Sequence, residues 1–300
     1  MSGIAGKNIL TYRTVIHLVF LLTSILFFIL PFLLIIIISL TDEQSIKTYG
    51  YQLIPKQWSL EAYRYTLSNL DQIRDSYLVT AGQSVLGTFL AVLIMALCAY
   101  SLSRSNFALR KPITVYLLIT MLFSGGLVPS YILNTQYLKL GNNFWIYVLP
   151  FLVSVFYIII FRTYFQGLPV EIIESAKMDG IGEFGLFARI VLPLSVPVVA
   201  TISFMFLLDR WNDWFTSLVY IRNPRLYTLQ YLLQKILMEM EFLRQLAVDA
   251  PGISSENYQN FPSEGMRYVM AIVAAGPMLV IFPLFQKYFV QGLTIGAVKG

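Results

Sequence analysis

The residues that could do chemistry in this 300-residue chain gather in two places. Residues 162–189 hold seven charged side chains, although the whole chain is only 12% charged. Residues 209–214 combine carboxylates, an amide and two indole rings. Neither place offers a nucleophile with a base, a His/Glu metal pair at helical spacing, or a glycine-rich phosphate loop. We therefore expect no catalysis by this chain, and binding or mechanical roles for both clusters.

The charged stretch predicts a short amphipathic helix. Pro169 suits a first helical turn because its missing N–H would be unpaired there, and Glu171 and Glu174 favour the positive end of the helix dipole. Gly180, which follows Asp179, adopts the left-handed conformation without steric cost and should end the helix. Apolar residues three and four apart are expected on one face: Ile172, Ile173 and Ala176.

The elements that carry these clusters must be membrane helices. The chain is 57% hydrophobic with a mean hydropathy of +0.69, which is too apolar for a soluble domain of this length. A helix of roughly 20 residues spans the hydrocarbon, and lipid leaves no backbone group unpaired, so the apolar runs predict six spanning helices in an all-α membrane protein. These spans are residues 14–40, 76–103, 112–138, 140–161, 190–219 and 268–289.

Charge bias between the loops predicts the orientation. The tail 1–13 and the short loop after the second span carry basic residues and no acids, whereas the third loop has only Lys139. The positive-inside rule therefore places both termini (1–13 and 290–300) and the charged segment 162–189 in the cytoplasm. The basic residues that set this bias are Lys7, Arg13, Arg104, Arg110 and Lys111. Because the net charge of +5 is spread over membrane loops, no nucleic-acid partner is predicted.

Two longer segments are then extracytoplasmic. Residues 41–75 should contain a short helix with Ser59 at its start. Residues 220–267 should begin with an amphipathic surface helix, because leucine and isoleucine recur at helical spacing among charged residues over 229–243. Residues 249–265 are rich in Pro, Gly, Ser and Asn, which predicts an exposed loop.

The cluster 209–214 has two interpretations. It comprises Asp209, Arg210, Trp211, Asn212, Asp213 and Trp214. Measured from Pro193 at 1.5 Å per residue, it falls about 24 to 32 Å along the fifth span. Indole faces beside amide and carboxylate groups could stack on a sugar and bond its hydroxyls. Alternatively, the tryptophans form an interfacial belt and a local ion pair holds the helix end. The residues leave both interpretations open.

The charged segment resembles a known family motif. Glu174-Ser175-Ala176, three residues, Gly180, nine residues and Ile190-Val191-Leu192-Pro193 match the spacing of the EAA motif of ABC importer permeases, with Ser175 as the only departure. In that family the segment is a coupling helix that docks into a groove on a cytoplasmic ATPase. The resemblance therefore assigns ATPase coupling to Glu171, Glu174, Ser175, Ala176, Asp179, Gly180, Ile190, Leu192 and Pro193. Without it, the segment would be an ordinary interfacial helix.

Other segments extend the resemblance over nearly the whole chain. Residues 31–32 with 39–42, 99–104, 123–129 and 283–300 look like the LplC/YtcP branch of carbohydrate-type permeases, related to the MalG type. The resemblance implies the six-helix type I importer (MetI-like) fold in the bacterial cytoplasmic membrane. It also implies import of oligosaccharides derived from complex polysaccharides or glycans, with the aromatic and polar residues at 209–214 near the pathway.

The same resemblance implies the partners. These are a second homologous permease, two cytoplasmic ATPase subunits that hold ATP and Mg²⁺, and an extracytoplasmic sugar-binding protein, so this chain itself binds no cofactor. Two rival functions remain at this point. An ion-coupled secondary carrier would need ionisable groups near the bilayer midplane, which the first four spans lack apart from His17 at one edge. A membrane assembly factor would have neither an ATPase nor a cargo.

Overall fold

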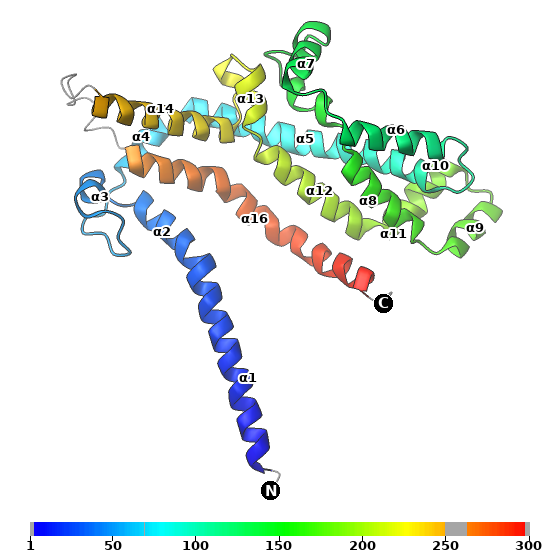
Figure 1. The fold of residues 1–300 in the computed structure, drawn as a ribbon, viewed down its shortest axis with the longest axis horizontal. Helices are drawn as coiled ribbons and strands as arrows, with labels where there is room; N and C mark the ends of the chain where they lie inside the picture. The colour runs from blue at the N-terminus through cyan, green and yellow to red at the C-terminus, as the bar shows by residue number, and fades with distance from the viewer. Residues whose placement is uncertain (1–2, 69, 250–262, 298–300) are drawn as a thin grey trace. The chain divides into compact units, whose positions relative to one another are not determined.

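The structure is a computed structural model that describes residues 3–68, 70–249 and 263–297 (Figure 1). Within these residues the chain is helical, and an isolated bridge between Thr41 and Trp58 is the extent of its β pairing. Two compact units make up the chain. Unit one comprises residues 1–70 and 235–275, and unit two comprises 71–234 and 276–300.

Unit one begins with the first apolar rod, drawn in blue in Figure 1. Helix α1 (Gly3–Ser24) passes through a π-helical turn at Ile25–Ile29 into α2 (Leu30–Ser39). Pro31 comes directly after the π-helical turn, inside the continuous rod, where its missing N–H leaves one hydrogen bond of the helix unmade. The stretch Thr14–Ser39 has a mean hydropathy of 3.1 and is almost entirely exposed, as a helix covered by lipid would be.

Short helices follow at the far end of this rod. They are α3 (Glu43–Tyr49) and α4 (Glu61–Ser68), joined in unit one by parts of α14 (Leu229–Asp249) and α16 (Ser263–Ala297). Asp42 caps α3 by accepting a 3.1 Å hydrogen bond from the Ser45 N–H, and Ser59 accepts one from the Glu61 N–H where α4 begins. The loop predicted over 249–265 falls, from 250 to 262, outside the described residues.

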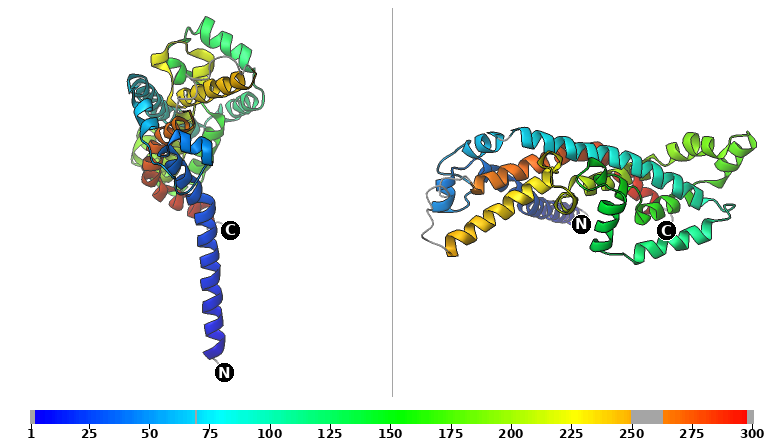
Figure 2. Two further views of the ribbon diagram at one scale, coloured as in Figure 1. Left: turned by 90° about the vertical axis from the view of Figure 1, so that its left-hand side faces the viewer. Right: turned by 90° about the horizontal axis from the view of Figure 1, so that it is seen from above.

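Unit two is built on α5 (Leu70–Ser103), which is 34 residues long, or roughly 50 Å. The right-hand view of Figure 2 shows α5, in cyan, as one unbroken rod. Small and flexible side chains on its second half, Ala91, Met95 and Ala99, are fully buried. They let neighbouring helices approach closely and share one apolar core with Phe161 and Val191.

The other helices of unit two are interrupted. These elements are α6 (Arg110–Leu122), α7 (Leu127–Ile132), α8 (Val155–Gln166), α9 (Val170–Met178), α10 (Glu183–Leu186), α11 (Leu192–Leu194), α12 (Val196–Trp211) and α13 (Phe215–Tyr220). The chain bends by 110° between α6 and α7, by 47° before α8, and by 81° at Ser195 before α12. The first bend lies near Gly126, whose φ of +85° favours glycine.

Three helices in the described residues are long and apolar enough to span a membrane alone, and six spans result if each bent pair counts as one. The single helices are Thr14–Ser39, Leu70–Ser103 and Glu264–Gln286. In the predicted fourth span, 140–161, residues 144–147 and 149–151 form 3-10 turns, and α8 begins at Val155 and continues to Gln166, beyond the predicted end. With 12 residues, about 18 Å, α8 is too short to cross the hydrocarbon alone.

Candidate coupling segment and polar cluster

Helix α9 carries the charged face predicted for the segment 162–189. It starts after Pro169 and ends in a Schellman motif, in which the Ile181 N–H donates to the Ala176 carbonyl (3.1 Å) and the Gly180 N–H to the Lys177 carbonyl (3.0 Å). Gly180 has a φ of +80°, and a Cβ there would meet no atom within 4 Å. The backbone conformation, and not space, therefore calls for glycine at this position.

The two faces of α9 differ in burial. Ile173 and Ala176 are buried in the core of unit two, and they anchor the helix. Ile172, which the helical pattern grouped with them, is instead 42% exposed. The carboxylates of Glu171 and Glu174 point away from the core and form no ion pair within the described residues. Ser175 and Asp179 are exposed as well.

A third carboxylate, which the motif did not single out, connects α9 to α5. Lys177 Nζ donates to Glu183 Oε1 at 2.6 Å, and the Tyr100 hydroxyl donates to Glu183 Oε2 at 2.5 Å. The guanidinium of Arg104 lies 4.3 Å from the centre of the Tyr100 ring. The hydrogen bonds from Lys177 and then Tyr100 hold the pKa of Glu183 below its ordinary value. The sequence clue was an acid at the first position of a short helix.

The end of the motif lies in the core and at a bend. Ile190 and Leu192 are partly buried against the apolar core that holds Ile173, whereas Pro193 is exposed in α11. The 81° change of direction follows at Ser195. From Glu174 to Pro193 the motif therefore runs from α9, through the turn at Gly180 and the short helix α10, to α11 just before the bend.

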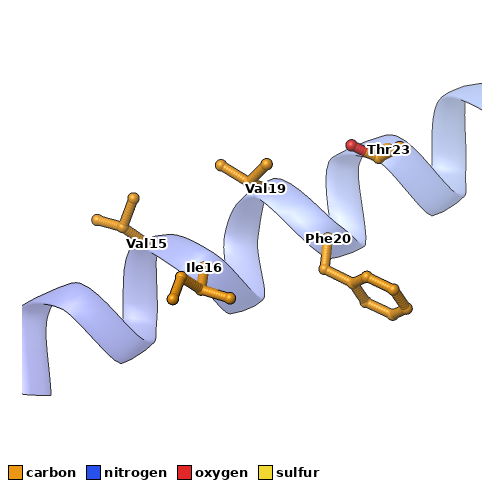
Figure 3. Close-up of a pocket in the computed structure, with 5 residues that line it drawn as sticks. All are labelled: Val15, Ile16, Val19, Phe20 and Thr23. Carbon is orange, nitrogen blue, oxygen red and sulfur yellow. The ribbon is translucent and has the colours of Figure 1, made fainter.

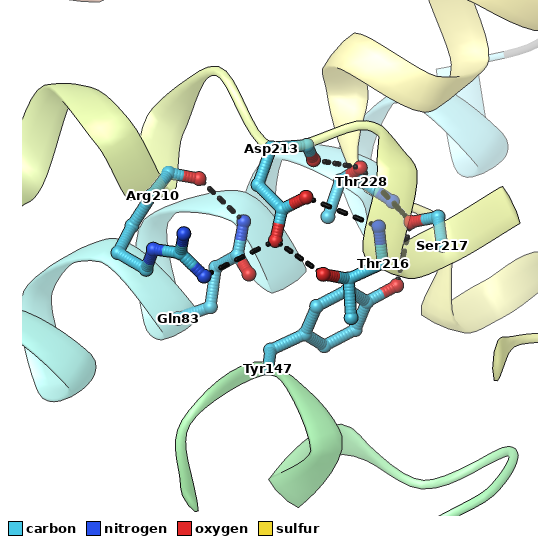
Figure 4. Close-up of polar contacts among 7 residues, drawn as sticks. All are labelled: Gln83, Tyr147, Arg210, Asp213, Thr216, Ser217 and Thr228. Atoms are coloured by element: carbon cyan, nitrogen blue, oxygen red, sulfur yellow. Dashed lines mark hydrogen bonds and ion pairs between the residues drawn. The ribbon is translucent and has the colours of Figure 1, made fainter. Parts of the chain in front are cut away.

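The structure divides the polar cluster at 209–214. Asp213 is mostly buried, and its carboxylate forms an ion pair with Arg210 (3.3 Å) and accepts from the Thr216 N–H (3.1 Å) and hydroxyl (2.6 Å), so it caps α13 (Figure 4). The Thr228 hydroxyl donates to the Asp213 carbonyl, and Gln83 Nε2 donates to the Arg210 carbonyl. These contacts hold together the end of α12 and the start of α13.

The network continues inward through hydroxyl groups. The Ser217 hydroxyl lies 2.9 Å from the Thr228 hydroxyl and 2.6 Å from the Tyr147 hydroxyl (Figure 4). The Tyr147 hydroxyl also donates to the Leu226 carbonyl. These contacts join residues that are distant in sequence: Tyr147 and Ser217 are 70 residues apart, and Ser217 and Thr228 are 11 apart. Trp211 is also buried, at 4% exposure. Trp211 and Asp213 therefore belong to the interior of unit two.

Two members of the cluster remain on the surface, Asp209 on α12 and Asn212 directly after its end. Asp209 is exposed and accepts a 2.8 Å hydrogen bond from the Tyr157 hydroxyl. Asn212, also exposed, donates to the Leu208 carbonyl and accepts from Gln230 Nε2 at 3.1 Å. Asp209 lies thirteen residues beyond Val196, about 20 Å along α12. Trp214 is half-buried against Phe215.

A surface hollow on α1 is lined by side chains of that one helix: Val15, Ile16, Val19, Phe20 and Thr23 (Figure 3). Nearly all of its surface is apolar. A ligand site usually has convergent walls from several elements, so this hollow is the uneven surface between side chains of one exposed apolar helix. In the part of the chain that the structure describes, no group of three His, Cys, Asp or Glu residues could hold a metal ion.

No family model matches the chain. Among curated proteins, it is 35% identical over 281 residues to the polygalacturonan/rhamnogalacturonan transport system permease protein YtcP of Bacillus subtilis, covering 94% of this chain and 96% of the relative. This chain belongs to the sugar ABC transporter permeases. Two other proteins of the same bacterium agree: Protein LplC (34% identical, covering 91% of this chain and 90% of LplC) and the arabinooligosaccharides permease AraQ (31%, 96% of each).

The fold of this sugar permease is that of a solved transporter. The structure of a bacterial ABC transporter involved in the import of the acidic polysaccharide alginate matches with a TM-score of 0.77 at 23% identity, covering 96% of this chain and 99% of that one. The family resemblance predicted from the motifs is thereby confirmed. The sugar permease is an integral membrane protein, the permease component of a carbohydrate or polysaccharide importer, and not itself an enzyme.

Proposed function

We propose that this sugar permease is one of two homologous permease subunits in an ATP-driven, binding-protein-dependent importer of oligosaccharides. Its cargo derives from complex polysaccharides or glycans, as the names of YtcP and AraQ suggest. In this proposal it lies in the bacterial cytoplasmic membrane with both termini inside, and each bent helix pair counts as one of six spans. Two ATPase subunits hold ATP and Mg²⁺, and an extracytoplasmic protein delivers the sugar.

The observation that carries this proposal is the exposed face of α9. Its buried side, Ile173 and Ala176, fixes the helix to unit two, while Glu171 and Glu174 project without ion-pair partners within the described chain. Large apolar side chains are exposed beside them, with Met178 at 85%. A short helix that presents both acids and apolar residues fits a groove on a partner subunit. We assign this groove to the ATPase.

Coupling then follows from how α9 is held. When a rigid helix is displaced, the elements packed against it move with it. The buried face of α9 lies in the same core as the second half of α5, and Ile190 and Leu192 pack against that core. Glu183 adds a polar link from Lys177 to Tyr100. Movement of the ATPases would therefore reach α5 and the bend at Ser195 together, as expected when packed elements switch between two arrangements.

The surface pair Asp209 and Asn212 is our candidate for the sugar pathway. A carboxylate and an amide exposed on a membrane helix are costly in lipid, so this face of α12 belongs against water or a partner subunit. Both side chains keep free acceptor capacity for sugar hydroxyls. Trp211 and Asp213, by contrast, are buried, and Asp213 pairs with Arg210, so we leave both out of the pathway.

Affinity purification of the tagged chain followed by mass spectrometry tests the assembly, with uptake measured in the same cells. Glu174→Lys should reduce recovery of the ATPase and abolish uptake. The matched control is Asp71→Lys, which reverses the charge of a carboxylate that is 93% exposed. Asp71 lies at the start of α5, whereas Tyr100, which is linked to α9 through Glu183, lies near its end. Recovery of the ATPase unchanged by Glu174→Lys would contradict the docking assignment, and uptake that an uncoupler collapses at constant ATP would favour the ion-coupled carrier.

A further inference from the structure

The loop between α3 and α4 is fastened to the end of the first apolar rod. The Ser59 N–H donates to the Leu40 carbonyl at 2.9 Å, and the Asp42 N–H donates to the Gln57 carbonyl at 3.2 Å. Thr41 and Trp58 form the antiparallel bridge between these two bonds. Residues 57–59 therefore lie at the level where the exposed apolar stretch Thr14–Ser39 ends. This depth is set by backbone bonds and not by a flexible tether.

The loop projects large apolar side chains from that level. Ile54 is 83% exposed, and four more residues are each more than half exposed: Tyr51, Leu53, Trp58 and Leu60. Lys56 lies with Nζ 3.5 Å from the centre of the Tyr49 ring. Indole and phenol rings, a lysine and aliphatic side chains together are the composition found where proteins meet the headgroups of a bilayer.

The start of α16, which also belongs to unit one, makes further contacts with α3 and this loop. The Tyr51 hydroxyl donates to Glu264 Oε2 at 3.0 Å, and its ring meets that of Tyr268 edge-on at 5.8 Å. Glu43 accepts from the Gly265 N–H at 3.2 Å at the start of α16. Because these contacts order the loop from both ends, its apolar side chains are held outward and do not fold back onto the protein.

We propose that residues 49–60 form a membrane-interface anchor, which places Leu53, Ile54 and Trp58 among the lipid headgroups and upper acyl chains at the Ser39 end of the first span. Lipid is the occupant we favour because the loop continues, at a fixed depth, the surface of a rod whose own side chains are exposed: Phe32, Leu33 and Ile36 are each near half exposed just below it. The anchor does not depend on ATPase coupling, on the sugar, or on which side of the membrane this end lies.

Spin labelling of the full-length chain in lipid nanodiscs, with its co-purifying subunits, tests the anchor. Single cysteines would be placed by Ile54→Cys and Trp58→Cys in a Cys98→Ala background. The control is Arg64→Cys, an exposed charged position on α4 of the same unit. We expect labels at 54 and 58 to collide more with oxygen, which concentrates in lipid, than with a water-soluble nickel chelate. The label at 64 should show the reverse order.

Two outcomes would overturn the anchor. Nickel-chelate access at 54 and 58 equal to that at 64 would show a solvated loop, and access to neither reagent would show a covering protein subunit. A second measurement needs no cysteine. Brominated lipids should quench the emission of Trp58, so the fraction of tryptophan emission that they quench should be smaller in Trp58→Phe than in the native protein. An equal quenched fraction in the two proteins would reject lipid contact.

Discussion

Tyr100 and Glu183 are 83 residues apart in sequence and are joined by a 2.5 Å hydrogen bond from the tyrosine hydroxyl to the carboxylate. Tyr100 is 6% exposed near the end of α5, and its ring lies 5.3 Å from that of Phe187. The other oxygen of Glu183 accepts from Lys177 on α9. One carboxylate thus connects the longest helix of unit two with the segment that we propose docks on the ATPase.

Glu183→Gln should lower uptake more than it lowers stability. The ion pair with Lys177 is largely exposed, and such pairs contribute at most about 1 kcal/mol, so the melting temperature should change little. Loss of the charge weakens both bonds that hold α9 to α5. Uptake and thermal unfolding would be measured together. Glu239→Gln, which disrupts a similarly exposed pair with Lys235 on α14, is the control and should leave uptake intact.

The pKa of Glu183 predicts the sign of its pH dependence. Because the folded pKa is lowered, the link stabilises the protein above the ordinary glutamate pKa of about 4.3 and is lost as pH falls through the folded value. The stability difference between the native protein and Glu183→Gln should therefore be constant from about pH 7 to pH 5 and shrink only below that. A difference that shrank already on acidification to pH 5 would refute the assignment of charge.

Gly180→Ala should destabilise the protein by about 1 kcal/mol, the cost of a side chain in the left-handed conformation. Gly180→Asn should cost less, since asparagine tolerates that conformation. Gly182→Ser provides the matched control, because Gly182 is two residues away, has a φ of −67°, and its Cβ would also meet no atom within 4 Å. Serine is suited to this position, which is the N-cap of α10. Equal losses at 180 and 182 in denaturation experiments would contradict the backbone explanation.

Asp213→Ala should be among the most damaging single changes in this region. It removes the α13 cap and leaves the Arg210 guanidinium, only 14% exposed, without its carboxylate partner. Breaking a buried pair typically costs about 3 to 5 kcal/mol. Thermal unfolding in detergent would measure the loss. The double change Arg210→Met with Asp213→Asn should recover much of it, because no charge then remains buried and unpaired.

Asp209→Asn and Asn212→Ala should have the opposite profile. Both side chains are exposed, so the melting temperature should stay within about one degree or two of the native value, consistent with ordinary surface substitutions. Uptake of the transported oligosaccharide should fall if they line its pathway. Normal uptake kinetics in the double variant would remove α12 from the pathway and return the cluster to a structural role.

Local rules predicted α9 well. A proline just before the helix, an acid in its first turn and glycine after Asp179 act through the backbone of neighbouring residues, so the helix and its left-handed end could be predicted from the order of residues alone. The same rules did not separate Ile172 from Ile173, since both fit an apolar stripe. Packing against the core buries the second and leaves the first exposed.

The amino-acid order by itself determined that this chain is a helical membrane protein of the sugar permease family, because apolar length and motif spacing are properties of the linear chain. Only the tertiary structure decided which member of the 209–214 cluster points where. Asp213 finds Arg210, Thr216 and Thr228 inside unit two, whereas Asp209 and Asn212 stay on its surface. It likewise joined Tyr100 to Glu183. Such partners are selected by how distant helices pack, which no local pattern of residues encodes.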